Sequence, residues 1–300
     1  MKIGLVLAGG GARGAYQIGV WKALIELGID KYIEVVSGTS IGAVNAMLFQ
    51  QNAYEMAEEF WCNVKKEQLL PIDEKELLVK GVLYAIGAKN INFIRKYIPK
   101  ALKAGTLTRE GMNEFVDKMD FDAIKNSKIK GYATCTRLPD LKTEYFYIND
   151  NSVEDIKKIL WATSAVPMIY DSQEINNAEY LDGGVGDNVP IQPVYGEGCN
   201  IIIVVHLAND SFIDKSLYPN TSFIEIIPED IEGYDLKEIM GFDSNVIKQR
   251  MFKGHKDAID KIKPIMDITR LIDKNELEKQ KNEQKFVNKL NKMFNKIKNN

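Results

Sequence analysis

The first fifty residues contain two short apolar runs, and each ends at a glycine-containing turn that leads directly into a helical pattern. The runs are Lys2 to Leu7 and Ile33 to Val36, and the helical patterns are Ala15 to Leu27 and Ile41 to Gln50. Gly28 follows the first helical pattern, at a place where glycine commonly ends a helix. A strand, a crossover helix and a second strand in this order predict a parallel sheet that is covered by helices.

The second turn, Gly38 to Gly42, fits the pattern G-x-S-x-G with Ser40 at its centre. A serine at a sharp strand-to-helix turn points its hydroxyl outward, and only glycine tolerates the crowding two residues to either side. The helix that follows directs its free N–H groups toward the turn. The pattern therefore predicts a nucleophile at Ser40. The alternative is a tight helix start in which Ser or Thr serves only as a cap.

The first turn is a glycine loop, Gly9-Gly10-Gly11-Ala12-Arg13-Gly14, for which we weigh three functions. Its spacing fits the dinucleotide fingerprint G-x-G-x-x-G, but the acid that should end the next strand is Glu34, near that strand's start. A phosphate-binding loop would need Gly-Lys-Ser/Thr, which is missing. Successive glycine N–H groups can also form an oxyanion hole. We favour the oxyanion hole, because the serine turn ends the adjacent strand; a turn without a ligand is the alternative.

A candidate base follows Glu179 to Leu181, in Asp182-Gly183-Gly184. An aspartate before two glycines is usually only a turn. Asp182 is singled out because the chain has just two histidines, His206 and His255. His206 follows the apolar run Ile201 to Val205, and the order Ser, Asp, His is that of the α/β-hydrolases. A triad with His206 is therefore the alternative to a pair of Ser40 and Asp182.

The rest of the chain predicts further helices and strands. Residues 71–120 should form short helices, for which we expect mainly ordinary packing, with a lid or substrate channel as the alternative. The predicted helices are Glu55 to Leu70, Thr108 to Met119, a helix capped by Ser152 that reaches Trp161, and Ser244 to Ile262; the predicted strands are Lys130 to Arg137, Thr143 to Ile148 and Thr221 to Ile227.

The composition of the chain limits the number of domains, the classes of partner and the cellular compartment that we expect. Three hundred residues with 45% hydrophobic content suffice for one large domain or two small ones, and a net charge of −3 gives no global attraction to nucleic acid or to anionic lipid. Three scattered cysteines argue for a reducing compartment. No signal peptide or apolar run of membrane-spanning length is seen, so we expect a cytoplasmic protein.

The C-terminal tail, from Asp273 onward, is rich in lysine and is predicted to be helical. Residues 274–300 hold eight Lys against three Glu, and six apolar residues fall on one helix face. Core packing of this face is the first expectation; self-association and contact with a membrane surface are the alternatives. The six residues are Phe286, Val287, Leu290, Met293, Phe294 and Ile297.

The glycine loop, the Ser40 turn and Asp182-Gly183-Gly184 stand in an order that resembles the patatin-like phospholipase family, in its bacterial cytoplasmic form. Ser164 to Pro167 also resembles the family's segment between nucleophile and aspartate, and the resemblance covers roughly residues 3–210. It implies a three-layer α/β/α sandwich with a mostly parallel central sheet. It also implies an acyl hydrolase with a serine–aspartate dyad and without a metal or cofactor.

The resemblance assigns a role to each motif residue: Ser40 is the nucleophile between Gly38 and Gly42, and Asp182 is the base. Gly10 and Gly11 supply the oxyanion N–H groups in the loop from Gly9 to Gly14, and Arg13 supports this loop or meets a lipid phosphate. The expected domains are an acyl hydrolase domain, 1–230, and a C-terminal helical extension, 231–300, that packs on or beside it. The expected substrate is a phospholipid or another acyl ester. A lipid-binding or regulatory module without turnover is the alternative, and the head group, acyl position, chain length and oligomeric state stay open.

Overall fold

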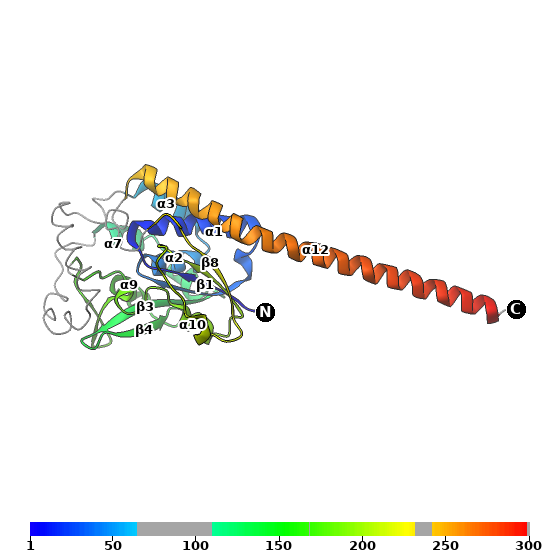
Figure 1. Ribbon diagram of the computed structural model, residues 1–300. Coiled ribbons are helices and arrows are strands. Elements are labelled where there is room, and N and C mark those ends of the chain that lie inside the picture. The colour runs from blue at the N-terminus through cyan, green and yellow to red at the C-terminus, as the bar shows by residue number, and fades with distance from the viewer. Residues whose placement is uncertain (65–109, 168, 232–241, 299–300) are drawn as a thin grey trace. The chain divides into compact units, whose positions relative to one another are not determined.

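The computed structural model describes residues 1–64, 110–167, 169–231 and 242–298, and of residues 110–112 and 289–298 only the backbone (Figure 1). The chain divides into two units, 1–258 and 259–300, and each is described by itself. The expected boundary after residue 230 lies beside residues outside the description, and it stays a prediction.

An eight-stranded mixed sheet forms the centre of the first unit. Its order is β5-β6-β3-β2-β1-β7-β8, with β4 paired to β3. Strands β3, β2, β1, β7 and β8 are mutually parallel, whereas β4 and β6 each run antiparallel to β3, and β5 runs antiparallel to β6. The strands are β1 Ile3–Leu7, β2 Ile33–Thr39, β3 Lys130–Leu138, β4 Lys142–Tyr147, β5 Gln173–Ile175, β6 Ala178–Asp182, β7 Ile201–Val205 and β8 Ser222–Ile226.

Helices cover both faces of this sheet. The described helices are α1 Ala15–Leu27, α2 Ile41–Gln50, α3 Tyr54–Asn63, α7 Glu110–Val116, α8 Phe121–Lys125, α9 Val153–Thr163, α10 Ile191–Gly196 and α12 Ser244–Lys298. Among the described residues, none of the helices offers a stretch long and apolar enough to cross a lipid bilayer.

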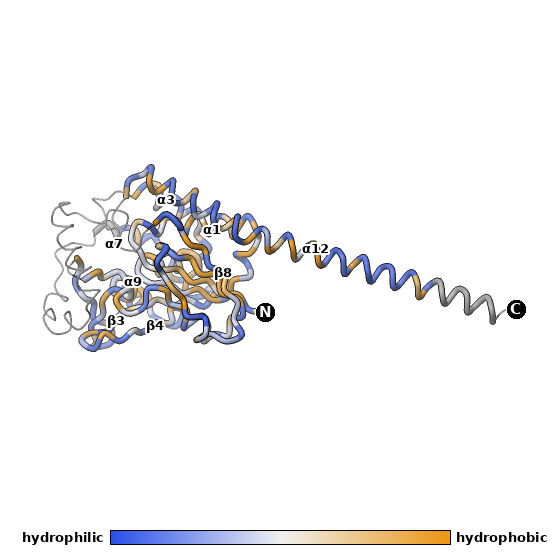
Figure 2. The backbone as a smooth tube through the Cα atoms, in the orientation of Figure 1, coloured by the Kyte–Doolittle hydropathy of each residue, from blue (hydrophilic) through white to orange (hydrophobic). Residues whose placement is uncertain are grey.

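Successive side chains of β1 point to opposite faces of the sheet, and each face is covered by its own layer of helices. Leu5 and Leu7 line the same small space as Ile18 and Trp21 of α1, while Val6 points the other way, into a core cluster with α10. Figure 1 accordingly shows α1 and α10 on opposite sides of the strands, and Figure 2 shows that apolar residues dominate the strands between them. The expected three-layer α/β/α sandwich with a mostly parallel sheet is therefore confirmed.

Most predicted elements are present, with shifted ends. β2 continues to Thr39, so the strand reaches the nucleophile turn itself, and α3 ends at Asn63, before the predicted end at Leu70. Thr108, the expected cap of α7, and residues 71–109, which include most of the expected lid segment, lie outside the described residues. The two predicted C-terminal helices are one, because α12 continues through Pro264.

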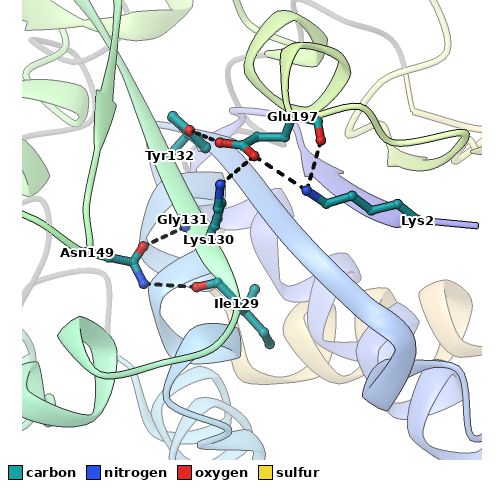
Figure 3. A network of polar contacts seen from close by, with 7 residues as sticks. All are labelled: Lys2, Ile129, Lys130, Gly131, Tyr132, Asn149 and Glu197. Atoms are coloured by element: carbon teal, nitrogen blue, oxygen red, sulfur yellow. Dashed lines mark hydrogen bonds and ion pairs between the residues drawn. The ribbon is translucent and has the colours of Figure 1, made fainter.

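A network of polar contacts ties together the N-terminal ends of the parallel strands (Figure 3). The Glu197 carboxylate, just after α10, accepts hydrogen bonds from Lys130 Nζ at 2.7 Å, from Tyr132 Oη at 2.6 Å and from Lys2 Nζ at 3.4 Å. Burial by itself would raise the pKa of Glu197, but the bonds from Lys130 and Tyr132 hold it below its ordinary value. The charged carboxylate thus joins the starts of β1 and β3 to α10.

Two glycines let α1 and the first part of α12 pack backbone against backbone. A Cβ atom on Gly19 would lie 1.8 Å from the carbonyl oxygen of Met251, and one on Gly254 would lie 2.0 Å from that of Tyr16. The Tyr16 hydroxyl donates to Asp257 at 2.8 Å beside this crossing. Residues 244–258 are therefore part of the first unit.

The second unit, taken alone, is the continuation of α12 from Ile259. It carries eleven Lys and Arg against six Asp and Glu, a net +5, whereas residues 1–258 carry −8, which together give the −3 of the chain. Figure 2 shows mainly hydrophilic residues along the coloured part of this helix beyond the α12 label. A single helix cannot bury its own apolar face, and seven large apolar side chains among its described residues are exposed: Ile265, Ile268, Leu271, Ile272, Leu277, Phe286 and Val287.

Candidate active site

Ser40 lies between the last residue of β2 and the first residue of α2, in a strained backbone conformation. Its φ is 55° and its ψ is −125°, a combination that is rare for residues other than glycine. A Cβ atom on Gly38 would lie 2.2 Å from the carbonyl oxygen of Gly42, and one on Gly42 would lie 2.2 Å from that of Leu7. Both positions of the motif therefore require glycine because backbone lies against them.

Asp182 reaches Ser40 from the end of β6, 142 residues further along the chain. Ser40 Oγ donates to Asp182 Oδ2 at 2.7 Å, and the N–H of Gly184 donates to Asp182 Oδ1, also at 2.7 Å. The sheet fixes this meeting, because Thr39 pairs with Thr134 and Asp182 pairs with the next residue of β3. The two predicted catalytic residues are thus in direct contact.

The glycine loop follows β1 on the other side of the serine. The N–H of Gly9 donates to the carbonyl of Asn188, whose side-chain amide donates back to the carbonyl of Gly9, both at 3.2 Å. A Cβ atom on Gly9 would lie 3.4 Å from the Cβ of Ser40, so the loop lies directly beside the nucleophile. Among the described residues, the N–H groups of Gly10 and Gly11 have no hydrogen-bond partner.

Arg13 and Gly14 face inward from this loop. The Arg13 side chain is buried, and its Nε donates to the carbonyl of Gly10 at 3.3 Å. A Cβ atom on Gly14 would lie 2.7 Å from Cγ1 of Ile41 and 2.9 Å from the ring of Trp61. Arg13 therefore supports the loop from within, and Gly14 lets the loop pack closely against the start of α2.

A buried polar network that the sequence did not predict supports the glycine loop from behind. Gln17 Nε2 donates to the carbonyl of Ala8 at 2.7 Å, and Asn45 Nδ2 donates to the carbonyl of Gly14 at 3.1 Å and to Gln17 Oε1 at 2.8 Å. Trp61 Nε1 donates to Asn45 Oδ1 at 3.2 Å. Polar residues on the apolar faces of α1 and α2 were the available sequence signal, since buried polar groups need partners.

The sequence also did not predict the role of the segment at the end of α9. The N–H of Ser40 donates to Thr163 Oγ1 at 2.9 Å, and Thr163 Oγ1 donates to the carbonyl of Thr134 at 2.6 Å. The N–H of Asp182 donates to the carbonyl of Ala165 at 3.0 Å. The signal was only indirect, in the resemblance of Ser164 to Pro167 to a family segment.

The partner of His206 is Glu225, a residue outside the Ser40–Asp182 pair. His206 is fully buried at the end of β7, with Nε2 at 3.1 Å from Glu225 Oε2, and its Nδ1 has no partner among the described residues. Burial lowers the pKa of His206, and Glu225 only partly opposes this effect. The structure brings Ser40 and Asp182 together, but it pairs His206 with a different carboxylate.

The chemistry of the cluster is that of a nucleophile beside a base. A hydroxyl that donates to a carboxylate, next to open backbone N–H groups, can attack a carbonyl and stabilise the oxyanion that forms. Cys135 is no competing nucleophile, because burial, with the nearby Asp182 charge, raises the pKa of its thiol well above the ordinary value. In the described part of the chain, no three His, Cys, Asp or Glu side chains gather as metal ligands would.

Comparisons with known proteins show which proteins this chain resembles. A family model described as "Patatin-like phospholipase" matches residues 5–195. Lysophospholipase nte1 of Aspergillus terreus is 27% identical over 212 residues, which are 69% of this chain and 12% of that protein. The corresponding protein of Saccharomyces cerevisiae is 25% identical over 216 residues, 69% of this chain and 11% of that protein.

This chain therefore spans only about a tenth of the length of these relatives. Both relatives are fungal, so the comparisons do not support the bacterial form of the family that the sequence suggested. The crystal structure of VipD from Legionella pneumophila superposes with a TM-score of 0.42 at 14% identity, covering 88% of this chain and 67% of that one.

Proposed function

Because the chain belongs to the patatin-like phospholipase family, we propose that it is a serine acyl hydrolase that cleaves fatty-acyl esters of phospholipids or related lipids. The observation that carries the proposal is the 2.7 Å hydrogen bond from Ser40 Oγ to Asp182 Oδ2. It joins two residues from different motifs, 142 positions apart, in the geometry that a nucleophile and its base require.

In the proposed reaction, Ser40 Oγ attacks the ester carbonyl while its proton passes to Asp182. The tetrahedral intermediate collapses as the alcohol leaves with that proton, and an acyl-enzyme remains. Water then attacks the acyl-enzyme and gives a proton to Asp182. As the second tetrahedral intermediate collapses, the fatty acid is released and Ser40 Oγ takes this proton from Asp182, which restores the starting pair. An aspartate with an ordinary pKa near 3.9 is a weak base, so the short hydrogen bond to Ser40 has to assist the transfer.

The oxyanion would be held by the glycine loop. The N–H of Ser40 is already bonded to Thr163, whereas the N–H groups of Gly10 and Gly11 are open donors in the loop beside the nucleophile. The contact of Arg13 with the carbonyl of Gly10 supports a role in shaping this loop rather than in meeting a lipid phosphate.

A dyad is proposed rather than a triad because His206 is bonded to Glu225, and Asp182 contacts Ser40 directly. The intact pair likewise supports an enzyme over a binding module without turnover. Lysophospholipids are the first substrates to test, since the relatives bear that name. No step of the proposed reaction uses a metal or cofactor, so activity should persist in a chelator.

The direct test is covalent labelling of Ser40 by a fluorophosphonate, followed by peptide mass spectrometry. Labelling should be present in the full chain, absent in Ser40→Ala, and much slower in Asp182→Asn, which keeps the shape of the base. Hydrolysis of lysophospholipid and diacyl phospholipid vesicles by the same three proteins then identifies the substrate. Absence of labelling and of hydrolysis in the wild type would refute the proposal.

We further propose that the second unit contacts anionic membrane surfaces. Its net +5 charge and its exposed apolar side chains support this contact, because each Lys or Arg near an anionic surface contributes about 1 kcal/mol. A cytoplasmic location belongs to the same proposal and is supported by three free cysteines, two of them buried.

Truncation after Asp273 tests the membrane contact. It removes a net +5, and binding to anionic vesicles should fall at least about tenfold, while hydrolysis of a short soluble ester is unchanged. The full-length control replaces Lys279, Lys281 and Lys285 with Gln, which should weaken binding to anionic vesicles and leave binding to neutral vesicles unaltered. A truncated chain that does not fold would show that the helix serves the core instead.

A further inference from the structure

One short segment at the end of α9 contacts the backbone of both members of the Ser40–Asp182 pair. Thr163 Oγ1 accepts the N–H of Ser40, and the carbonyl of Ala165 accepts the N–H of Asp182, at 2.9 and 3.0 Å. We propose that Thr163 is a positioning residue that holds Ser40 in its reactive backbone conformation; this assignment rests on the hydrolase function proposed above.

The conformation of Ser40 needs such support. A non-glycine residue with φ 55° and ψ −125° is strained, and it persists only where the surroundings fix it. The first turn of α2 fixes one side of the residue, because the N–H groups of Ala43 and Val44 donate to the carbonyl of Ser40 at 2.9 and 3.3 Å. Thr163 fixes the other side through the N–H.

Thr163 is itself held rigidly. It is fully buried, and its hydroxyl donates to the carbonyl of Thr134 on β3 at 2.6 Å while it accepts from Ser40. Thr134 pairs with Thr39, the residue before the nucleophile, so the hydroxyl spans two neighbouring strands at the turn. Without it, the N–H of Ser40 and the carbonyl of Thr134 would each lose a hydrogen bond, which is unfavourable enough to shift the turn.

The chain offers a matched set of substitutions. Thr163→Val keeps the shape and removes both hydrogen bonds, whereas Thr163→Ser keeps the hydroxyl. Thr134→Val is the control: Thr134 is equally buried, and its Oγ1 has no partner among the described residues, so this change removes no bond. The carbonyl of Thr134 still accepts from Thr163 in the control.

The experiment measures kcat and KM for a short p-nitrophenyl ester, the rate of Ser40 labelling by a fluorophosphonate, and the melting temperature of each variant. Thr163→Val should lower kcat and the labelling rate by roughly 10- to 100-fold with KM within about threefold, since a small misplacement of a reacting group has effects of this size. Thr163→Ser should stay within about threefold of wild type, and Thr134→Val within about twofold.

A Thr163→Val protein that melts earlier but keeps the wild-type kcat would overturn the assignment, because the residue would then serve stability alone. If Thr163→Val does not fold, Thr163→Ala is measured in its place with the same expected loss, and an unchanged kcat there overturns the assignment equally. A wild type that is neither active nor labelled overturns the proposed hydrolase and this assignment together, whereas an active wild type with an unchanged variant overturns only the assignment.

Discussion

At the N-terminal end of the parallel strands, the Glu197 carboxylate accepts hydrogen bonds from Lys2, Lys130 and Tyr132. At the C-terminal end, Ser40 is held at a positive φ, and glycine N–H groups beside it have no partner in the described part of the chain. The sheet therefore has hydrogen-bonded charged groups at the N-terminal end of its parallel strands. At their C-terminal end it has a strained residue and N–H groups without a partner in the described part of the chain. Stability and reactivity are assigned to opposite ends of one sheet.

Substitution of the catalytic pair should give the largest contrast between the two ends. Ser40→Ala and Asp182→Asn should each reduce kcat for ester hydrolysis by more than about a thousandfold, as expected when a member of a nucleophile–base unit is lost. Melting temperatures should change by only a few degrees, because neither change removes apolar packing. Steady-state kinetics and thermal unfolding measure the two effects, and near-normal turnover in either variant would contradict the assignment.

Glu197→Gln, at the N-terminal end of the strands, should lower the stability of the protein and leave kcat unchanged. The expected loss at pH 7 is about 1 to 3 kcal/mol in the free energy of unfolding, typical of hydrogen bonds to a charged group. Because the folded protein holds the pKa of Glu197 below its ordinary value, this contribution is present above that value and is lost as pH falls through the folded-state pKa. Denaturant unfolding from pH 7 to pH 3 should show the two proteins converging in acid.

A stability difference between wild type and Glu197→Gln that stayed constant across this pH range would show that the charge of Glu197 is not what joins the strands. A large fall in kcat would show that the two ends are coupled, and the comparison would then fail.

His206→Asn should have a much smaller effect on kcat than Ser40→Ala or Asp182→Asn. It tests whether the catalytic site at the C-terminal end of the strands includes the residue that follows β7. His206 lies at the end of β7 but is bonded to Glu225, so kcat should stay within about tenfold of wild type. In a triad, loss of the histidine would reduce turnover by about three orders of magnitude or more. Such a collapse in a folded variant would make His206, and not Asp182, the group that takes the proton.

The sequence predicted those parts of the site that depend on local backbone. Gly38 and Gly42 are required because backbone lies against them. The five-residue pattern from Gly38 to Gly42 was therefore enough to predict the turn and its nucleophile. Asp182 was predicted through its motif and the shortage of histidines, although its contact with Ser40 depends on antiparallel pairing of β6 with β3.

Thr163 and Gln17 were not predicted as part of the site, because their roles depend on partners that are distant in sequence or on other elements. A threonine at the end of an amphipathic helix has no local feature that distinguishes a cap from a support of the nucleophile 123 residues away. The continuity of α12 was missed for a related reason. Proline usually interrupts a helix, but α12 continues through Pro264, which is at an exposed position.

The crossing of α1 and α12 has a consequence for protein engineering. Glycines inside helices are standard targets for stabilisation, since replacement by alanine commonly gains up to about 1 kcal/mol. At Gly19 and Gly254 this rule reverses, because a single methyl group would collide with the carbonyl of Met251 or of Tyr16. A thermostabilisation library built by helix propensity alone should therefore omit these two positions.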